Sequence, residues 1–149
     1  MNRHRPQVMK KRILLADDDF AVRELLSRAL KSEEFEMVQA RNGDEAIFQM
    51  MASEPDLVLL DISMPGKDGW QSYEVMERLS PLTPVILITA LPDQHAHAVR
   101  QGIDALMEKP LDIPLLVHTI NRLLEESEQQ RVMRLTRGDF KTEHLRHSG

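Results

Sequence analysis

Short runs of apolar residues recur along the chain, and each run is continuous rather than alternating. Residues 13–16, 57–60 and 85–88 are such runs. A strand of a parallel sheet that is buried on both faces has this pattern. A strand with one solvent-exposed face alternates apolar and polar residues instead. Two weaker strands fit at residues 36–40 and 105–108. The pattern predicts a buried parallel sheet of five strands.

Between the predicted strands, apolar residues repeat with the period of a helix. Residues 22–30 place apolar side chains at i, i+3, i+4, i+7 and i+8, and residues 116–124 repeat one apolar face. Asp19, Asn42 and Asp112 stand where they can cap helices. Five helices that alternate with five strands predict a doubly wound α/β fold. The ligand site of such a fold lies outside the carboxyl ends of the strands.

Length and composition limit the kind of protein. The chain has 149 residues, of which 42% are hydrophobic and 29% charged, as expected for one soluble domain. We expect this domain at residues 11–126, an N-terminal extension at 1–10 and a C-terminal helical extension or polar tail at 127–149. A net charge of -5 gives no electrostatic reason to expect direct nucleic-acid binding. The chain has no cysteine, which excludes disulfides and thiol chemistry.

The C-terminal residues exceed what the predicted fold needs. A last helix that continued from residue 112 to 137 would be about 39 Å long and project beyond the domain. A frayed polar tail is the alternative, in which His144 and His147 would be solvated. The basic N-terminal residues lead to no signal-peptide core, and no spanning segment follows. We therefore expect a cytoplasmic protein without membrane contact.

Polar residues of particular types stand where the predicted strands end. Three consecutive aspartates at residues 17–19 follow the first strand, and the third strand ends at Asp61. The fourth strand ends at Thr89, and Lys109 follows the fifth. Because parallel strands end at the same edge of a sheet, these side chains are expected to converge. Clustered carboxylates resist joint ionisation unless a cation lies among them, so the pattern predicts an oxygen-liganded metal, magnesium above all.

The same groups suit phosphoryl transfer. A carboxylate beside a metal can act as a nucleophile toward phosphorus. The metal, a lysine and a hydroxyl can neutralise the oxygens of the transferred group. The residue types at the strand ends therefore favour a site that accepts a phosphoryl group.

Four stretches carry these residues in a set order, at 13–19, 56–69, 86–90 and 108–110. The second of them contains Asp61 and the loop Met64-Pro65-Gly66-Lys67-Asp68-Gly69. Together they resemble the response-regulator receiver domain, the phosphoacceptor of two-component signalling, over about residues 11–126. The resemblance implies a flavodoxin-like α/β fold with a five-stranded parallel sheet in the order 2-1-3-4-5 and five helices.

The resemblance also assigns roles at the acidic end of the sheet. Asp61 is the implied phosphoacceptor. Asp18 and Asp61 would bind Mg2+, or Mn2+, directly, and Asp17 would hold the ion through water. The backbone carbonyl of Ser63 would supply a further ligand.

Further roles follow for the fourth and fifth strands. Thr89 would bond a phosphoryl oxygen, and Lys109 would pair with the phosphate. A cis peptide between Lys109 and Pro110 would direct the ammonium inward. Many receivers carry Tyr or Phe where this chain has Leu106. Leucine has no ring to swing, so we expect Thr89 and the helix at 91–102 to carry the signal while Leu106 stays packed.

The implied protein is a signalling phosphoacceptor and not a turnover enzyme. Its phosphodonor would be a sensor histidine kinase or a histidine phosphotransfer protein. Output to an unidentified downstream protein is expected through contacts on the fourth helix, fifth strand and fifth helix. A homodimer that forms on phosphorylation is a further hypothesis.

Two other interpretations fit parts of the sequence. A haloacid-dehalogenase-like phosphatase would use Asp17 as its nucleophile, and residues 17–21 approximate its signature, although Ala21 departs from it. A pseudo-receiver would bind partners without phosphorylation, yet every residue that the chemistry needs is present. The phosphatase and the receiver predict different labelled residues, Asp17 and Asp61.

Overall fold

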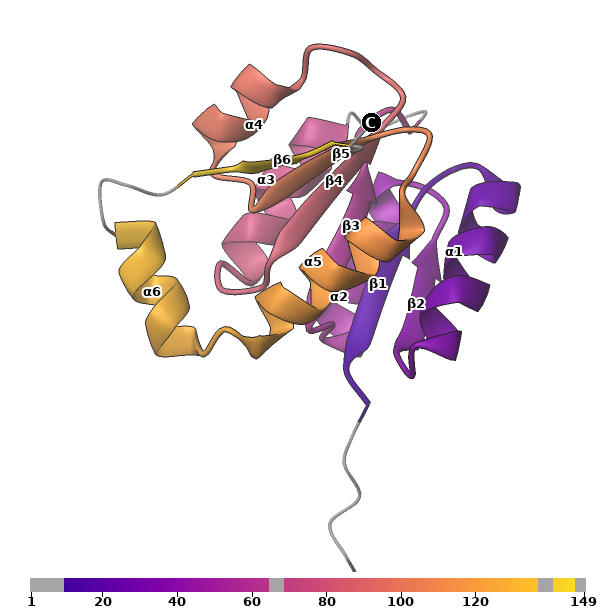
Figure 1. Cartoon of the computed structure of the whole chain (residues 1–149), viewed down its shortest axis with the longest axis horizontal. Coiled ribbons are helices and arrows are strands. Elements are labelled where there is room, and N and C mark those ends of the chain that lie inside the picture. Colours follow the sequence, from indigo (N-terminus) through magenta and orange to yellow (C-terminus); the bar gives the residue numbers. More distant parts are fainter. Residues whose placement is uncertain (1–9, 65–68, 137–140, 147–149) are drawn as a thin grey trace, which may run out of the picture.

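Parallel strands form a single sheet in the order β2-β1-β3-β4-β5-β6 (Figure 1). The computed structural model describes residues 10–64, 69–136 and 141–146. The strands are β1 (Arg12–Ala16), β2 (Glu36–Ala40), β3 (Leu57–Asp61), β4 (Val85–Thr89), β5 (Ala105–Glu108) and β6 (Glu143–Leu145). The expected α/β class and the order of the first five strands are confirmed.

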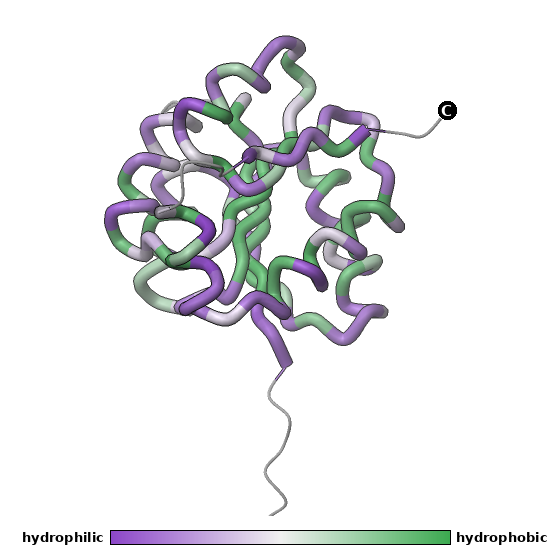
Figure 2. Tube along the Cα trace, turned by 60° about the vertical axis from the view of Figure 1, so that its left-hand side comes forward, coloured by the Kyte–Doolittle hydropathy of each residue, from purple (hydrophilic) through white to green (hydrophobic). Residues whose placement is uncertain are grey.

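Helices cover both faces of the sheet, which Figure 2 shows nearly edge-on between two layers. They are α1 (Phe20–Ser32), α2 (Gly43–Ser53), α3 (Gly69–Leu79), α4 (His95–Gln101), α5 (Ile113–Glu125) and α6 (Glu128–Thr136). On one face, Leu60 and Leu87 share a buried cluster with residues of α2, α3 and α4. On the other, Leu59 and Ile88 share one with residues of α1 and α5. Burial on both faces explains why the strands are continuously apolar.

The predicted helix starts are confirmed by their caps. The Asp19 carboxylate accepts hydrogen bonds from the amides of Ala21 and Val22. Asn42 accepts from the amide of Glu45, and Asp112 from the amide at the third position of α5. These bonds satisfy amides that have no partner within the helix, and so they fix where α1, α2 and α5 begin.

The C-terminal part differs from the prediction. In the described residues there are six strands and six helices, so the expectation of five of each is wrong by α6 and β6. The last helix does not run on to residue 137, because the backbone of Glu126 is extended and ends α5. The Ser127 hydroxyl then accepts from the amide of Gln130 and starts α6. His144, expected to be solvated, is only 16% exposed, and His147 lies outside the described residues.

A buried ion pair attaches α6 to the sheet. Asp104, which precedes β5, is 4% exposed and accepts hydrogen bonds from Arg131 at 2.6 and 3.0 Å. Its carboxylate also accepts from Arg134 at 2.9 Å and from the amide of Val85 at 2.9 Å. A buried carboxylate needs such partners, since ionisation away from water is otherwise costly. These contacts fix α6 beside the entry to β4 and β5.

Among residues 10–64, 69–136 and 141–146, no helix is both long enough and apolar enough to span a bilayer.

We predict unequal costs for breaking a buried and an exposed ion pair of this region. Arg131→Met is expected to lower the free energy of unfolding by about 3 kcal/mol. The buried Asp104 would then have a single cationic partner, Arg134, which is partly exposed. Arg122→Met removes the half-exposed partner of Glu143 and should cost less than about 1 kcal/mol. Urea unfolding of both variants measures the difference. Equal costs would contradict the anchoring role of Arg131.

Candidate functional site

Four strand ends bring the predicted site residues to one edge of the sheet. Asp17 follows β1, Asp61 ends β3, Thr89 ends β4 and Lys109 follows β5. Asp61 lies opposite Ile88, and Thr89 lies opposite Glu108, so the three strands end within one residue of the same level. The side chains of Asp17, Asp61 and Thr89 are almost fully buried. The convergence expected from parallel strands is therefore present.

Three carboxylates gather at this edge. One oxygen from each of Asp17, Asp18 and Asp61 lies within 4.8 Å of the others. Asp17 and Asp61 are buried, whereas Asp18 is exposed and leaves the cluster open to solvent. Oxygen ligands at this spacing suit a hard divalent cation such as Mg2+. The donor set therefore fits the metal that the sequence pattern suggests.

Lys109 joins two of these carboxylates. Its Nζ donates to Oδ2 of Asp17 at 2.9 Å and to Oδ2 of Asp61 at 3.2 Å. The peptide bond between Lys109 and Pro110 is cis, the geometry that the resemblance implied. Burial lowers the pKa of Lys109, but the hydrogen bonds and charges of both aspartates outweigh it, so this pKa lies above the ordinary value. The ammonium stays charged across the physiological range.

Asp17 is the carboxylate most affected by its surroundings. Burial raises its pKa above the ordinary value, and the charge of Asp61 acts in the same direction. Hydrogen bonds from the amide of Asp19 and from Lys109 oppose the shift without cancelling it. A proton therefore competes with a cation for Asp17 at higher pH than for an exposed aspartate.

Asp61 has different partners on its two oxygens. The amide and the hydroxyl of Ser63 donate to Oδ1 at 2.8 and 2.6 Å, while Oδ2 faces Lys109. The structure thus places Ser63 beside Asp61 through its amide and hydroxyl. The metal-ligand role expected of the Ser63 carbonyl stays a prediction. The loop residues Pro65, Gly66, Lys67 and Asp68 lie outside the described residues.

The hydroxyl side of the site belongs to β4. The Thr89 hydroxyl accepts a hydrogen bond from the amide of Leu91 at 2.9 Å. The backbone carbonyl of Thr89 accepts one from the amide of Lys109 at 2.7 Å. Leu106 lies on β5 opposite Leu87, fully buried among the side chains that pack under α4. Thr89 is therefore at the site itself, and Leu106 lies beneath it in the core.

Sequence reasoning missed Arg23. This residue of α1 is 7% exposed, and its guanidinium donates to the backbone carbonyl of Asp17 at 2.7 Å and to Gln39 at 3.2 Å. It thus holds the backbone of the acidic segment. A signal was present, since Arg23 stands three, four and seven residues before Leu26, Ser27 and Leu30, on the buried face of the helix. A charged residue at such a position needs a buried partner.

The response regulator receiver domain is the protein family that matches this chain, over residues 13–139. The chain belongs to this family. It is 36% identical over 118 residues to the transcriptional regulatory protein GlrR of Escherichia coli, covering 77% of this chain and 26% of GlrR. It is 33% identical over 125 residues to the transcriptional regulatory protein ResD of Bacillus subtilis, covering 83% of this chain and 52% of ResD.

Solved receiver structures share the fold. A CheY-like receiver domain protein from Methanospirillum hungatei superposes with a TM-score of 0.77 at 27% identity, covering 82% of this chain and 99% of that one. The response regulator TrrA from Thermotoga maritima, solved in complex with Mg2+ and BeF, gives 0.71 at 32% identity, covering 76% of this chain and 98% of TrrA. The phosphatase and pseudo-receiver interpretations gain no support from these relatives.

The curated relatives are longer than this chain. The chain spans about a quarter of GlrR and about half of ResD. It also matches about a quarter of NtrC from Salmonella typhimurium, a DNA-binding transcriptional regulator, at 32% identity over 120 residues and 79% of this chain. The family membership therefore concerns the receiver domain, which is the part that these proteins have in common with this chain.

Proposed function

We propose that this receiver domain accepts a phosphoryl group on Asp61 from a sensor histidine kinase or a histidine phosphotransfer protein. The observation that carries the proposal is the position of Asp61, buried at the end of β3 with Lys109 at 3.2 Å and two further carboxylates within 4.8 Å. In the transfer, an Asp61 oxygen attacks phosphorus, an O–P bond forms, and the N–P bond of the phosphohistidine breaks. The histidine keeps the electron pair of that bond.

A divalent metal is part of this proposal. Asp18 and Asp61 would bind Mg2+, or Mn2+, directly, Asp17 would hold it through water, and the Ser63 carbonyl would be a further ligand. The short spacing of the three carboxylates supports this assignment, as does the Mg2+ and BeF complex of the relative TrrA. When bound, the cation would offset negative charge on the carboxylates and on the transferred group.

Side chains of this chain serve the phosphoryl group in other ways. Lys109 already lies between Asp17 and Asp61, so its ammonium is in place to pair with an oxygen bound to Asp61. The Thr89 hydroxyl, now bonded to the Leu91 amide, is proposed to bond another phosphoryl oxygen. Movement of Thr89 would shift the loop that leads to α4. The domain assists its own phosphorylation in this way but is not a turnover enzyme.

Output is proposed to run through protein contacts on α4, β5 and α5, to an unidentified target. The net charge of -5 favours a protein over nucleic acid as the direct partner of these residues. The DNA-binding role of NtrC belongs to a protein about four times as long as the matched segment. A dimer that forms on phosphorylation and a cytoplasmic location complete the proposal.

We predict that acetyl phosphate or a phosphohistidine donor labels Asp61, and only in the presence of Mg2+. Asp61→Asn should reduce the label to background, because the amide is no nucleophile toward phosphorus. Mass spectrometry of digested protein locates the label. Asp93→Asn, an exchange of the same kind at an exposed loop residue, is the matched control and should label normally. Label on Asp17, or label retained in Asp61→Asn, would overturn the proposal and favour the phosphatase.

Asp18 and Lys109 should fail in different ways. Asp18→Ala is expected to weaken Mg2+ binding by about tenfold or more, because it removes a direct ligand. Lys109→Ala should leave Mg2+ bound but impair phosphorylation or its transmission. Fluorescence of Trp70 during Mg2+ titration measures the first effect, and the labelling assay measures the second. Asp19→Ala, which removes an adjacent carboxylate used as a helix cap, should keep its Mg2+ affinity.

Equal loss of Mg2+ affinity in Asp18→Ala and Lys109→Ala would contradict the separate roles of these two residues.

Leu106 is expected to stay packed when the site is filled. The residue is fully buried under α4, and an aliphatic side chain has no ring face to present to a partner. Methyl NMR with and without Mg2+ and beryllofluoride, which imitates a phosphoryl group, should therefore show larger shifts around Thr89 than at Leu106. A rotamer change at Leu106 as large as the response around Thr89 would refute this expectation.

A further inference from the structure

The outer edge of β5 is covered by the chain's own C-terminal residues. β6 pairs with β5 in parallel, so that Ala105, Leu106 and Met107 lie opposite Glu143, His144 and Leu145. The Glu143 amide donates to the carbonyl of Asp104 at 3.0 Å. Figure 1 shows β6 lying along β5 below α4. A three-residue strand thus occupies an edge that lies on the proposed output face.

Few side-chain contacts hold β6 itself, whereas Thr142 before it is bound firmly, because its buried hydroxyl donates to the carbonyl of Ile103 at 2.6 Å. Leu145, 6% exposed, is the one buried apolar residue of β6 and belongs to the cluster of α5. Glu143 pairs with Arg122, but both side chains are 47% exposed, and such pairs contribute little. A strand of three residues with one apolar anchor buries little surface. β6 can therefore leave the sheet at the cost of exposing one apolar side chain, that of Leu145.

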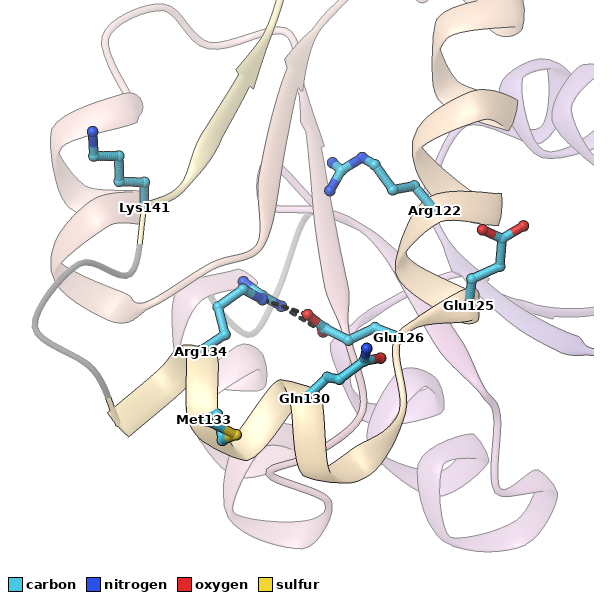
Figure 3. A pocket seen from close by; sticks show the side chains of 7 residues that line it. All are labelled: Arg122, Glu125, Glu126, Gln130, Met133, Arg134 and Lys141. Carbon is cyan, nitrogen blue, oxygen red and sulfur yellow. Dashed lines mark hydrogen bonds and ion pairs between the residues drawn. The ribbon is translucent and has the colours of Figure 1, made fainter.

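By contrast, a buried ion pair holds α6 in place, and a cleft separates α6 from α5. The buried Arg131–Asp104 pair fixes α6 beside β5. Between α6, α5 and the start of the β6 segment lies an open cleft of about 810 Å³ (Figure 3). Its lining includes Arg122 and Glu125 on α5, Arg134 on α6, and Lys141. The cleft borders Lys141, which leads into β6, while β6 itself packs against α5 through Leu145.

His144 is held between two elements that lead to the phosphorylation site. Its Nε2 is 3.3 Å from Oε1 of Glu108, and its ring stacks on His95 with centroids 4.9 Å apart and an interplanar angle of 17°. Glu108 directly precedes Lys109. His95 begins α4, six residues after Thr89. Each contact of His144 therefore lies a short step along the chain from a residue that is proposed to bind the phosphoryl group.

A pocket joins the two regions. It has a volume of about 330 Å³ and is lined by Glu108, Lys109, Pro110, His144, Leu145 and Arg146. Lys109 lines this pocket, its amide donates to the carbonyl of Thr89, and its ammonium bonds Asp17 and Asp61. A shift of Lys109 toward a phosphoryl group would displace residues that contact β6.

We propose that residues 143–146 form a strap that covers the edge of β5 in the resting protein and is released when Asp61 carries a phosphoryl group, while Thr142 keeps its bond to Ile103. α6 stays anchored at Asp104 while β6 leaves. The inference rests on the proposed function, because it needs the ammonium of Lys109 to exchange its bond to Asp17 for one to the phosphoryl group and Thr89 to move toward that group. By linkage, the strap and the phosphoryl group must weaken each other's binding by the same factor. Release bares the edge of β5 and the flanking face of α4.

Hydrogen exchange of the full chain, with and without Mg2+ and beryllofluoride, tests the release. We expect the amides of residues 143–145 to exchange at least about fivefold faster when the site is filled. The amides of α6 around Arg131 should keep their rates, since the anchor at Asp104 does not change. This contrast separates release of β6 from unfolding of the whole C-terminal segment.

Two variants test the reverse direction. Leu145→Asp removes the apolar anchor, and His144→Ala removes the contacts to Glu108 and His95 while leaving the core intact. Both are expected to bind beryllofluoride about fivefold more tightly than the natural chain, measured by Trp70 fluorescence at fixed Mg2+. Val132→Asp, at an exposed position of α6, and His118→Ala, at an exposed position of α5, are the matched controls and should bind normally. If Leu145→Asp does not fold, His144→Ala carries the comparison.

The outcomes are distinguishable. Beryllofluoride binding with unchanged exchange at residues 143–145 and equal affinities in all variants would overturn the strap and leave the proposed function standing. Absence of any beryllofluoride response in the natural chain would overturn the proposed function, and the strap with it. Faster exchange throughout α6 would also contradict the strap, because it would mean that the anchor is lost.

Discussion

The ammonium of Lys109 allows two buried carboxylates to share one edge of the sheet. Asp17 and Asp61 are almost fully enclosed, and their charges repel each other. A cation within hydrogen-bonding distance of both offsets this repulsion and keeps the ends of β1, β3 and β5 together. The chemistry of the site and the closure of the sheet edge thus depend on the same contact. Ser63, Thr89 and Arg23 then orient the groups around it.

The sheet and the candidate site could be predicted because their signals are local. A strand with both faces buried must be apolar at every position, so residues 57–60 and 85–88 stood out from their surroundings. The strands of a parallel sheet end at one edge. This topology alone predicts that Asp61, Thr89 and Lys109 lie close together. Helix caps such as Asp19 are likewise a property of a few neighbouring residues.

The parts that sequence reasoning missed depend on partners far away in the chain. β6 has three residues and no apolar run, and it exists because β5 offers an unpaired edge. The ion pair of Arg131 and Asp104 positions α6. These residues are 27 apart in the sequence, and the residues around each of them give no sign of the pairing. His144 in isolation is an ordinary polar residue, and only the positions of Glu108 and His95 enclose it. Such contacts are decided by tertiary structure.

The anchor of α6 at Asp104 affects how strongly another protein must bind in order to pair with the edge of β5. Because Arg131 ties the preceding helix to the domain, β6 competes for that edge from within the same molecule. A short tether gives an effective concentration on the order of millimolar, independent of how much protein is present. An outside strand of equal intrinsic affinity would have to exceed this concentration. Three weakly held residues can therefore exclude ordinary competitors, and a modest loss of their affinity is enough to change which strand occupies the sheet.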